Sequence, residues 1–175
     1  MTSTAVVVGA SLAGMNAART LRLEGHEGAI IVLDPDLRAQ YDRPPLSKQF
    51  LAEDLDPDRI MLQSAKEELG LDVRLGTRAT ALDLGEHRLS TQHADGTLSS
   101  LNYDSLVIAT GASARRLPET AGVAGVHVVR TVDDSLALRA DLDAGPRRVV
   151  VIGAGFIGGE VAACLLYTSP SPRDS

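Results

Sequence analysis

The stretch VVVIGAGFIGGE, Val149–Glu160, decides the fold class of this protein. Four β-branched residues predict a short buried strand, and glycines follow at positions 153, 155 and 158. Glycines at this spacing permit a tight turn, a close backbone approach to a diphosphate, and close packing of the next helix on the strand. The free N–H groups at the start of that helix favour an anion. The stretch therefore predicts a strand–loop–helix unit that binds a dinucleotide.

The same pattern opens the chain in AVVVGASLAG, Ala5–Gly14, which predicts a buried strand at 5–8, a loop and a helix. Ser11 stands where the second glycine is expected. Its hydroxyl can donate to a phosphate, but its side chain restricts the approach of the backbone. The chain therefore contains two beginnings of a nucleotide-binding fold.

The helix after the first loop has small apolar residues four positions apart, which predict a buried face formed by Ala13, Ala17 and Leu21. Gly25 suits the C-terminal cap of this helix. A second buried strand is predicted at 29–33.

Two acidic residues, Asp34 and Asp36, follow this second strand. A carboxylate at this position of a βαβ unit accepts hydrogen bonds from ribose hydroxyls. The spacing does not decide between the two, and either can instead be a solvated carboxylate in a loop.

The middle of the chain predicts a mixture of elements. Asp95-Gly96 is a two-residue hairpin signal between two strands. The other expected elements are a short helix at 64–70, strands within 71–76, 79–84, 87–92 and 105–111, and a helix through Leu136 and Ala140.

Composition excludes several classes of function. The net charge is −6, and only 3% of the residues are aromatic, with no tryptophan. Neither a basic surface nor an aromatic stacking platform for nucleic acid is expected. No apolar run approaches the ~20 residues that span a bilayer, so no membrane association is expected. The four histidines lack metal-ligand spacing, and a single cysteine fits a reducing, cytoplasmic location.

The stretch YDRPPLSK, Tyr41–Lys48, follows the first βαβ unit. Pro44 and Pro45 are expected to hold Arg43 extended and to place Ser47 and Lys48 at the start of a short helix. A fixed arginine suits a diphosphate, and a fixed lysine stabilises developing negative charge. The alternative is a proline-bounded helix start with solvated charges.

The last residues, CLLYTSPSPRDS at 164–175, change composition abruptly. We interpret them as the in-frame translation of a transposase-based sequencing adaptor rather than as a Pro/Ser linker. The natural sequence is then expected to be cut near Ala163, with no cysteine of its own.

Taken in order, these segments resemble the FAD-dependent NAD(P)H–ferredoxin and rubredoxin reductases, relatives of apoptosis-inducing-factor-like proteins. The resemblance covers residues 5–163. It implies an α/β fold of the two-dinucleotide-binding-domain flavoproteins: a Rossmann-like FAD domain with a β-meander, and the start of an NAD(P) domain, truncated. The expected divisions are an FAD-binding domain at 1–113, a linker and partial NAD(P)-binding domain at 114–163, and the adaptor-derived tail.

The resemblance also implies a function. Electrons would pass from NAD(P)H, with NADH favoured, through FAD to a ferredoxin-type iron–sulfur protein that serves a cytochrome P450 or a ring-hydroxylating dioxygenase. Related disulfide reductases carry a redox cysteine pair where this chain has RPPLSKQF. The alternatives are an NADH oxidase, a nitrite-reductase flavoprotein or an apoptosis-inducing-factor-like binding protein. The residue that separates NADH from NADPH would lie near position 178, and the fragment alone is expected to be inactive.

Site residues follow from the same resemblance. Lys48 and Glu160 would pair near the flavin and nicotinamide, although Glu160 can also be a first-turn glutamate favoured by the helix dipole. Ala79 stands where the family usually has valine, and Asp36 where it usually has glutamate. The expected FAD contacts are Gly9, Ser11, Leu12, Ala13, Gly14, Asp34, Asp36, Arg43, Pro44, Lys48, Ala79, Ala109, Thr110, Gly111 and Arg130. The expected NAD(P)H contacts are Gly153, Gly155, Phe156, Ile157, Gly158 and Glu160.

Overall fold

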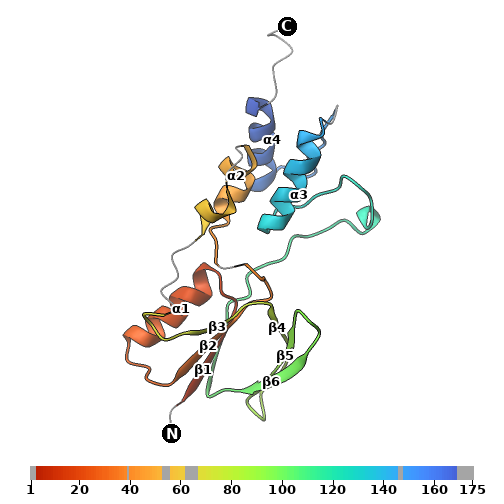
Figure 1. Cartoon of the computed structure of the whole chain (residues 1–175). Helices are drawn as coiled ribbons and strands as arrows, with labels where there is room; N and C mark the ends of the chain where they lie inside the picture. Colours follow the sequence, from red (N-terminus) through yellow and green to blue (C-terminus); the bar gives the residue numbers. More distant parts are fainter. Residues whose placement is uncertain (1–2, 39, 53–55, 62–66, 146–147, 169–175) are drawn as a thin grey trace. The chain divides into compact units, whose positions relative to one another are not determined.

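The computed structural model describes residues 3–38, 40–52, 56–61, 67–145 and 148–168 (Figure 1). The chain packs as two units. The first consists of Met1–Asp42 and Met61–Gly111, and the second of Arg43–Ile60 and Ala112–Ser175. Residues 43–60, which the sequence places within the FAD-binding domain, thus pack with the second unit. The functional domain boundary near residue 113 stays a prediction.

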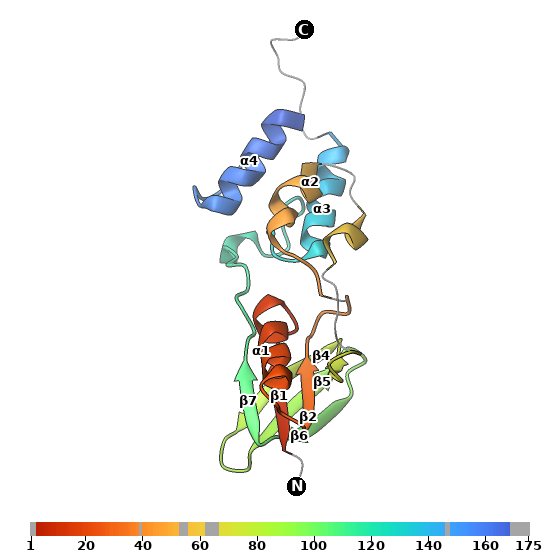
Figure 2. The ribbon, with the colours of Figure 1, turned by 90° about the vertical axis from the view of Figure 1, so that its left-hand side faces the viewer.

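A parallel sheet of four strands forms the centre of the first unit. Its order is β3-β2-β1-β7, and β1 pairs with β2 on one side and β7 on the other (Figure 2). The expected strands at 5–8, 29–33 and within 105–111 are confirmed. The strands are β1 Thr4–Val8, β2 Ala29–Leu33, β3 Asp72–Arg74 and β7 Ser105–Ile108.

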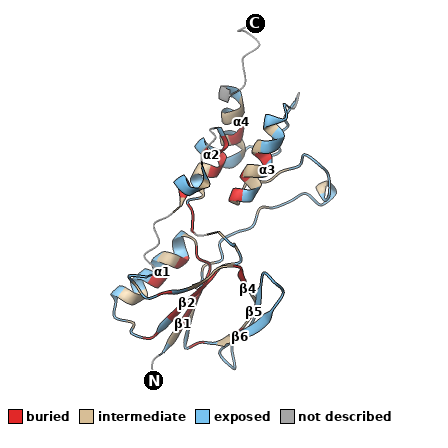
Figure 3. Ribbon diagram, in the orientation of Figure 1, coloured by how far each residue is buried: buried red, intermediate tan, exposed pale blue. Residues whose placement is uncertain are grey.

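Both faces of this sheet are covered, which explains its continuous apolar strands. Helix α1, Leu12–Leu23, packs on one face against Ala5 and Val7. The antiparallel sheet packs on the other face against Val6 and Val8. Figure 3 shows β1 and β2 largely in the colour of buried residues.

The buried face of α1 agrees with the expected one only in part. Leu21 packs against the core as expected, but Gly14 and Ala18 are the buried residues, whereas Ala13 is exposed and Ala17 is only partly buried. At Gly14 a Cβ would collide with the Gly9 carbonyl and lie close to a Val7 methyl group, so the glycine belongs to the buried face in place of Ala13. The expected cap is confirmed, since Gly25 has φ +91° and its N–H donates to the carbonyl of Arg22.

The antiparallel sheet is the expected β-meander, with strand order β4-β5-β6. The turn at Asp95-Gly96 is confirmed, because Gly96 has φ +89° and its N–H donates to the His93 carbonyl at 2.9 Å. The strands are β4 Thr77–Asp83, β5 Arg88–His93 and β6 Leu98–Asn102. The helix expected at 64–70 lies partly outside the described residues, and residues 67–70 form a turn instead.

Short helical elements make up the second unit. Its core contains Leu51, Leu138 and Val161. The helix expected through Leu136 and Ala140 is confirmed, and it begins at a capping box between Thr131 and Asp134. The elements are η1 Pro44–Ser47, α2 Gln49–Ala52, η2 Pro57–Ile60, η3 Pro118–Thr120, α3 Val132–Asp143 and α4 Phe156–Thr168.

The strand expected at 149–152 does not form. These residues have no regular structure, and Val150 and Ile152 are 72% and 73% exposed. A parallel strand exists only by pairing with a neighbour, and the described part of the second unit contains no strand. The sequence pattern was right about the apolar character but wrong about the structure.

Within the ranges that the structure describes, no helix is both long and apolar enough to cross a bilayer. Over those ranges, no group of three or more His, Cys, Asp or Glu side chains is arranged to hold a metal ion.

Candidate cofactor-binding sites

The first glycine loop lies where the carboxyl ends of β1, β2 and β7 meet. The N–H of Gly9 donates to the Leu33 carbonyl at 2.7 Å, and the N–H of Ala109 donates to the Val8 carbonyl at 2.8 Å. Strand β2 lies on one side of β1 and β7 on the other, so the connections diverge here. Such a switch point is where open α/β sheets bind their ligands.

The glycines of this loop are required by close backbone contacts. Gly9 has φ +110°, and a Cβ on it would collide with the Ala109 carbonyl. A Cβ on Gly14 would collide with the carbonyl oxygen of Gly9 and lie 3.2 Å from a Val7 methyl group. The loop therefore brings helix and strand together as the sequence predicts.

The start of α1 suits a diphosphate. Ser11 is its N-cap residue and makes no side-chain capping hydrogen bond. The first-turn N–H groups, including those of Leu12 and Ala13, have no acceptor within the helix, and both residues are exposed. Because these donors surround a tight glycine loop, the residues present fit the diphosphate of a dinucleotide.

Asp34 and Asp36 hold different parts of the chain. The carboxylate of Asp34 accepts from the N–H of Ala10 at 2.7 Å and from the N–H of Asp36 at 2.9 Å. The carboxylate of Asp36 accepts from the N–H of Arg38 and from the hydroxyl of Tyr41, both at 2.9 Å. Asp34 therefore ties the glycine loop to the end of β2, whereas Asp36 orders the segment that follows.

The remaining predicted contacts of the first unit lie in two places. Thr110 and Gly111 follow β7, next to Ala109, and Gly111 has φ +68°. Ala79 lies in β4 beside a β-bulge and packs against the core on the meander side of the sheet. The structure thus brings Ala109 to the glycine loop, and the ligand contacts of all four residues stay predictions.

The second glycine loop reproduces the backbone of the first. Gly153 has φ +106°, and a Cβ on Gly158 would lie 2.6 Å from the Gly153 carbonyl oxygen and 3.2 Å from a Val151 methyl group. The Gly155 carbonyl accepts from the N–H four residues on at 2.9 Å, as the Ser11 carbonyl does at 3.0 Å. The loop therefore forms without a paired strand before it.

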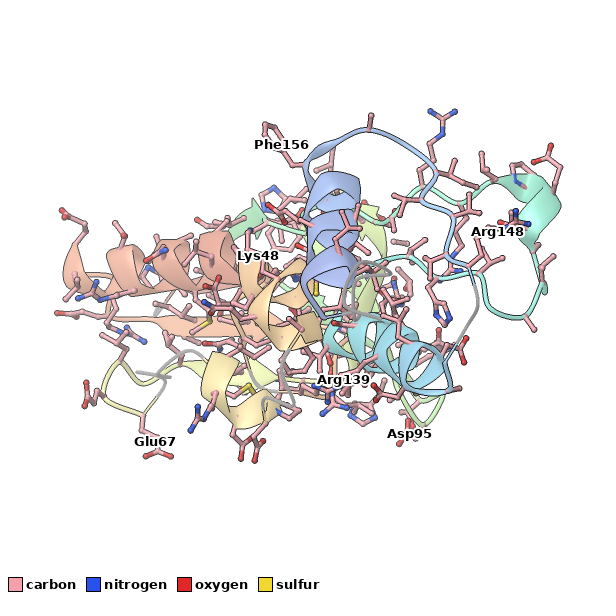
Figure 4. All side chains as sticks on the ribbon, turned by 90° about the horizontal axis from the view of Figure 1, so that it is seen from above. Lys48, Glu67, Asp95, Arg139, Arg148 and Phe156 are labelled. Carbon is pink, nitrogen blue, oxygen red and sulfur yellow. The ribbon has the colours of Figure 1, made fainter. Side chains whose placement is uncertain are left out.

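The two apolar residues of this loop point into solvent. Phe156 is 93% exposed and projects from the start of α4 (Figure 4). Ile157 is also exposed. Nothing lies within 4 Å of the Cβ position of Gly155, so the backbone there is open to a ligand.

Arg43 is not extended as expected. It has φ −86° and ψ −33°, in the helical region, and is the N-cap residue of η1. Its carbonyl accepts from the N–H of Leu46 at 3.0 Å, and that turn decides its conformation against the preference of residues before proline. Pro44 and Pro45 instead fill the first positions of the turn, where a missing N–H costs nothing.

The turn brings together two predicted catalytic residues. The Lys48 Nζ lies 2.9 Å from Glu160 Oε1 (Lys48 is labelled in Figure 4). The Ser47 hydroxyl donates to Glu160 Oε2 at 2.5 Å. These two donors lower the pKa of Glu160, with the Ser47 hydroxyl as the larger cause. The alternative of a first-turn glutamate is wrong, because α4 begins at Phe156 and has no acidic residue in its first turn.

Helix α3 anchors this turn. The Ser135 hydroxyl is completely buried and donates to the Leu46 carbonyl at 2.8 Å. The Arg139 guanidinium donates to the Phe50 carbonyl at 3.2 Å and lies 5.2 Å from the centre of the Phe50 ring. No local pattern in the sequence indicates these contacts or the role of Ser47, because each hydrogen bond joins segments that lie far apart in the chain.

Arg130 lies just before α3. Its N–H donates to the Asp134 carboxylate at 3.1 Å, as part of the network that starts the helix. The FAD contact expected for its side chain stays a prediction.

Comparisons with known proteins place this chain among flavoprotein reductase relatives. The chain is 41% identical over 164 residues to the ferredoxin–NAD(+) reductase component of the biphenyl dioxygenase system of Paraburkholderia xenovorans, covering 93% of this chain and 39% of that protein. Its fold matches putidaredoxin reductase in a covalent complex with putidaredoxin, with a TM-score of 0.84 and 34% identity over 95% of this chain and 40% of that one.

A ferredoxin reductase for the CYP199A2 system of Rhodopseudomonas palustris matches with the same TM-score and 33% identity, over 95% of this chain and 41% of that one. The chain thus spans about two fifths of the length of each of these proteins. The profile of the pyridine nucleotide-disulphide oxidoreductase family matches residues 3–168. This protein therefore belongs to the pyridine nucleotide-disulphide oxidoreductase family, and the resemblance found in its sequence is confirmed.

Proposed function

We propose that this chain is part of an FAD-dependent NAD(P)H–ferredoxin reductase. The observation that carries the proposal is the ion pair between Lys48 and Glu160. Glu160 lies on the helix that begins at the second glycine loop, and Lys48 lies on the turn that the resemblance assigns to the flavin. The pair therefore links the proposed nicotinamide loop to the proposed flavin side within one packing unit.

FAD, when bound, would supply the redox chemistry that joins a two-electron donor to a one-electron acceptor. The protein would supply binding and charge. The loop from Gly9 to Gly14 would bind the FAD diphosphate, and Asp36 or Asp34 the ribose. The loop from Gly153 to Gly158 would bind NAD(P)H. NADH is favoured because the biphenyl-system relative is named as a ferredoxin–NAD(+) reductase component.

The electron acceptor would be another protein. The chain contains one cysteine, Cys164, and two are needed for a disulfide within the chain. A cysteine-using oxidase is disfavoured because the stretch RPPLSKQF, where related reductases carry their redox cysteines, contains no cysteine. We assign the acceptor role to a ferredoxin-type iron–sulfur protein that serves a ring-hydroxylating dioxygenase or a cytochrome P450, supported by the names of the relatives. A reducing, cytoplasmic location would suit this role.

The test uses the full reading frame that contains this chain, purified and loaded with FAD. We expect one FAD per chain, bleaching of the flavin absorbance by NADH without oxygen, and rapid reduction of cytochrome c only when a ferredoxin is added. Oxygen consumption as fast as ferredoxin reduction would indicate an oxidase. A long-lived charge-transfer band with NADH and slow ferredoxin reduction would indicate an apoptosis-inducing-factor-like protein. Failure to bind FAD would overturn the proposal.

A further inference from the structure

The two oxygens of the Glu160 carboxylate are held by two different donors. Oε2 accepts from the Ser47 hydroxyl at 2.5 Å, and Oε1 accepts from the Lys48 ammonium at 2.9 Å. The donors are neighbours in sequence but differ in exposure. Ser47 is 4% exposed, whereas the Lys48 side chain is 48% exposed. A short, part-buried contact with Ser47 and a more exposed contact with Lys48 thus share a single carboxylate.

Both ends of the contact between Ser47 and Glu160 are fixed by packing. Ser47 ends the η1 turn, whose Leu46 carbonyl accepts from the buried Ser135 hydroxyl. On the other side, Val161 follows Glu160 and packs against Leu51, which follows the turn. The Ser47 hydroxyl therefore approaches the carboxylate along a fixed direction.

The Lys48 ammonium is held less firmly, because its contact with the Pro44 carbonyl is long, 3.4 Å, and lies at an exposed site. An exposed lysine has many rotamers, and an exposed pair is weak because water competes for both charges. A carboxylate without the Ser47 bond would rotate and meet the ammonium only part of the time.

We infer that Ser47 is the positioning residue that locks the Glu160 carboxylate onto Lys48. The hydroxyl thereby sets how much of the Lys48 charge is neutralised. In the reductase this sets the positive charge beside the flavin, a consequence that rests on the proposed function. Loss of the Ser47 hydroxyl then exposes more of the Lys48 charge and favours the reduced, negatively charged flavin.

The sequence offers a direct probe, because Lys48 and Lys66 are its only lysines. Competitive acetylation followed by mass spectrometry gives the ratio of Lys48 to Lys66 labelling in one sample. A paired ammonium acylates slowly, so Ser47→Ala should raise this ratio roughly two- to fivefold, as expected for loss of an exposed pair. The pH dependence of the NMR shift of the Glu160 carboxyl carbon should show that the pKa of Glu160 rises toward its ordinary value in Ser47→Ala.

Ser135→Ala is the matched control. It removes another buried serine hydroxyl that bonds the same turn, but one that does not touch Glu160. It should lower the melting temperature but change the labelling ratio and the Glu160 pKa less than Ser47→Ala does, because it loosens the turn without removing the hydrogen bond to Glu160. Glu160→Gln should raise the ratio as Ser47→Ala does, and the double variant should rise no further, because Ser47 acts only through Glu160.

These measurements use the full reading frame, with and without FAD. An unchanged ratio in Ser47→Ala, an equal change in Ser135→Ala, or an additive double variant would overturn the inference. In the FAD-loaded protein, Ser47→Ala should raise the midpoint potential. If no variant binds FAD while the ratio and the pKa respond as expected, the proposed function fails and the positioning role of Ser47 stands.

Discussion

The Nζ of Lys48 lies 2.9 Å from Oε1 of Glu160, joining the proline-bounded turn to the helix that follows the second glycine loop. The side chains are 48% and 29% exposed, so the pair is accessible to solvent and to a ligand. The ion pair places a positive charge and a negative charge at one point of the second unit. Replacing one of the two charged residues is therefore the first test of the function of this unit.

Replacement of Lys48 by alanine should slow the reduction of bound FAD by NADH by about tenfold or more, since a positive charge near developing negative charge is removed. Lys48→Arg keeps the positive charge and should slow this reduction less than Lys48→Ala does. Anaerobic stopped-flow absorbance measures the rate, and a dye-equilibrated titration gives the midpoint potential. If Lys48→Ala retains both the rate and the potential, the lysine has no such role.

The contribution of Glu160 to stability should depend on pH. The Ser47 hydroxyl and the Lys48 ammonium lower its pKa in the folded state. A carboxylate with a lowered folded pKa stabilises the fold above its unfolded pKa, about 4.3, and loses this contribution as pH falls through the folded value. Glu160→Gln should therefore melt below the wild type at pH 6–7, and the difference should close as the pH falls below about 4. Melting curves by circular dichroism check this, and a gap that persists at pH 2 would contradict it.

Adjacent glycines of the second loop should respond in opposite directions. Gly158→Ala brings a Cβ against the Gly153 carbonyl and should lower the free energy of unfolding by about 1–3 kcal/mol. A Cβ on residue 159 has no atom within 4 Å, so Gly159→Ala should raise the free energy of unfolding by about 0.5–1 kcal/mol through helix propensity. Gly14→Ala in the first loop should behave like Gly158→Ala and also weaken FAD binding. Urea unfolding measures all three, and equal effects at 158 and 159 would argue against the packed loop.

Substitution of Asp34 and substitution of Asp36 should have different effects, one on folding stability and the other on FAD affinity. The asparagine in Asp34→Asn has one acceptor oxygen and cannot replace both oxygens that accept from the N–H groups of Ala10 and Asp36. The substitution should therefore lower the free energy of unfolding of the ligand-free protein by about 1–3 kcal/mol. Asp36→Asn should act mainly on FAD affinity if its carboxylate binds the ribose. Tyr41→Phe, which removes the hydroxyl that donates to Asp36, serves as the control for the effect of Asp36 on this segment. Isothermal titration and urea unfolding distinguish the two residues, and the reverse order of effects would exchange their roles.

The tail offers a prediction about the gene. If residues 164–175 derive from an adaptor, the natural reading frame should continue past the codon of Ala163 and encode the rest of the helix. The acidic or basic residue that selects NADH or NADPH should then be encoded near position 178. Sequencing that junction checks it. A stop codon directly after CLLYTSPSPRDS in the source DNA would show that the tail is natural.

Local pattern predicted the strands of the first unit well, because each apolar run there has a neighbouring strand to pair with in the sheet β3-β2-β1-β7. The apolar runs at 5–8 and 29–33 became β1 and β2, and Asp95-Gly96 became the turn of the meander. The same kind of run at 149–152 failed as a strand, since strand structure depends on a neighbour that pattern does not supply. The preference of a residue before proline likewise failed at Arg43, where the hydrogen bond of the turn outweighs it.

The sequence by itself determined the family, the two glycine loops and the residue types that suit a dinucleotide, because these depend on spacing along one strand–loop–helix unit. Only the tertiary structure decided which donors meet each oxygen of Glu160, that Asp34 ties the glycine loop to β2, and that α3 anchors the turn before Lys48. A hydrogen bond between segments far apart in the chain requires both backbones to be fixed in space, and that is a property of packing rather than of local sequence.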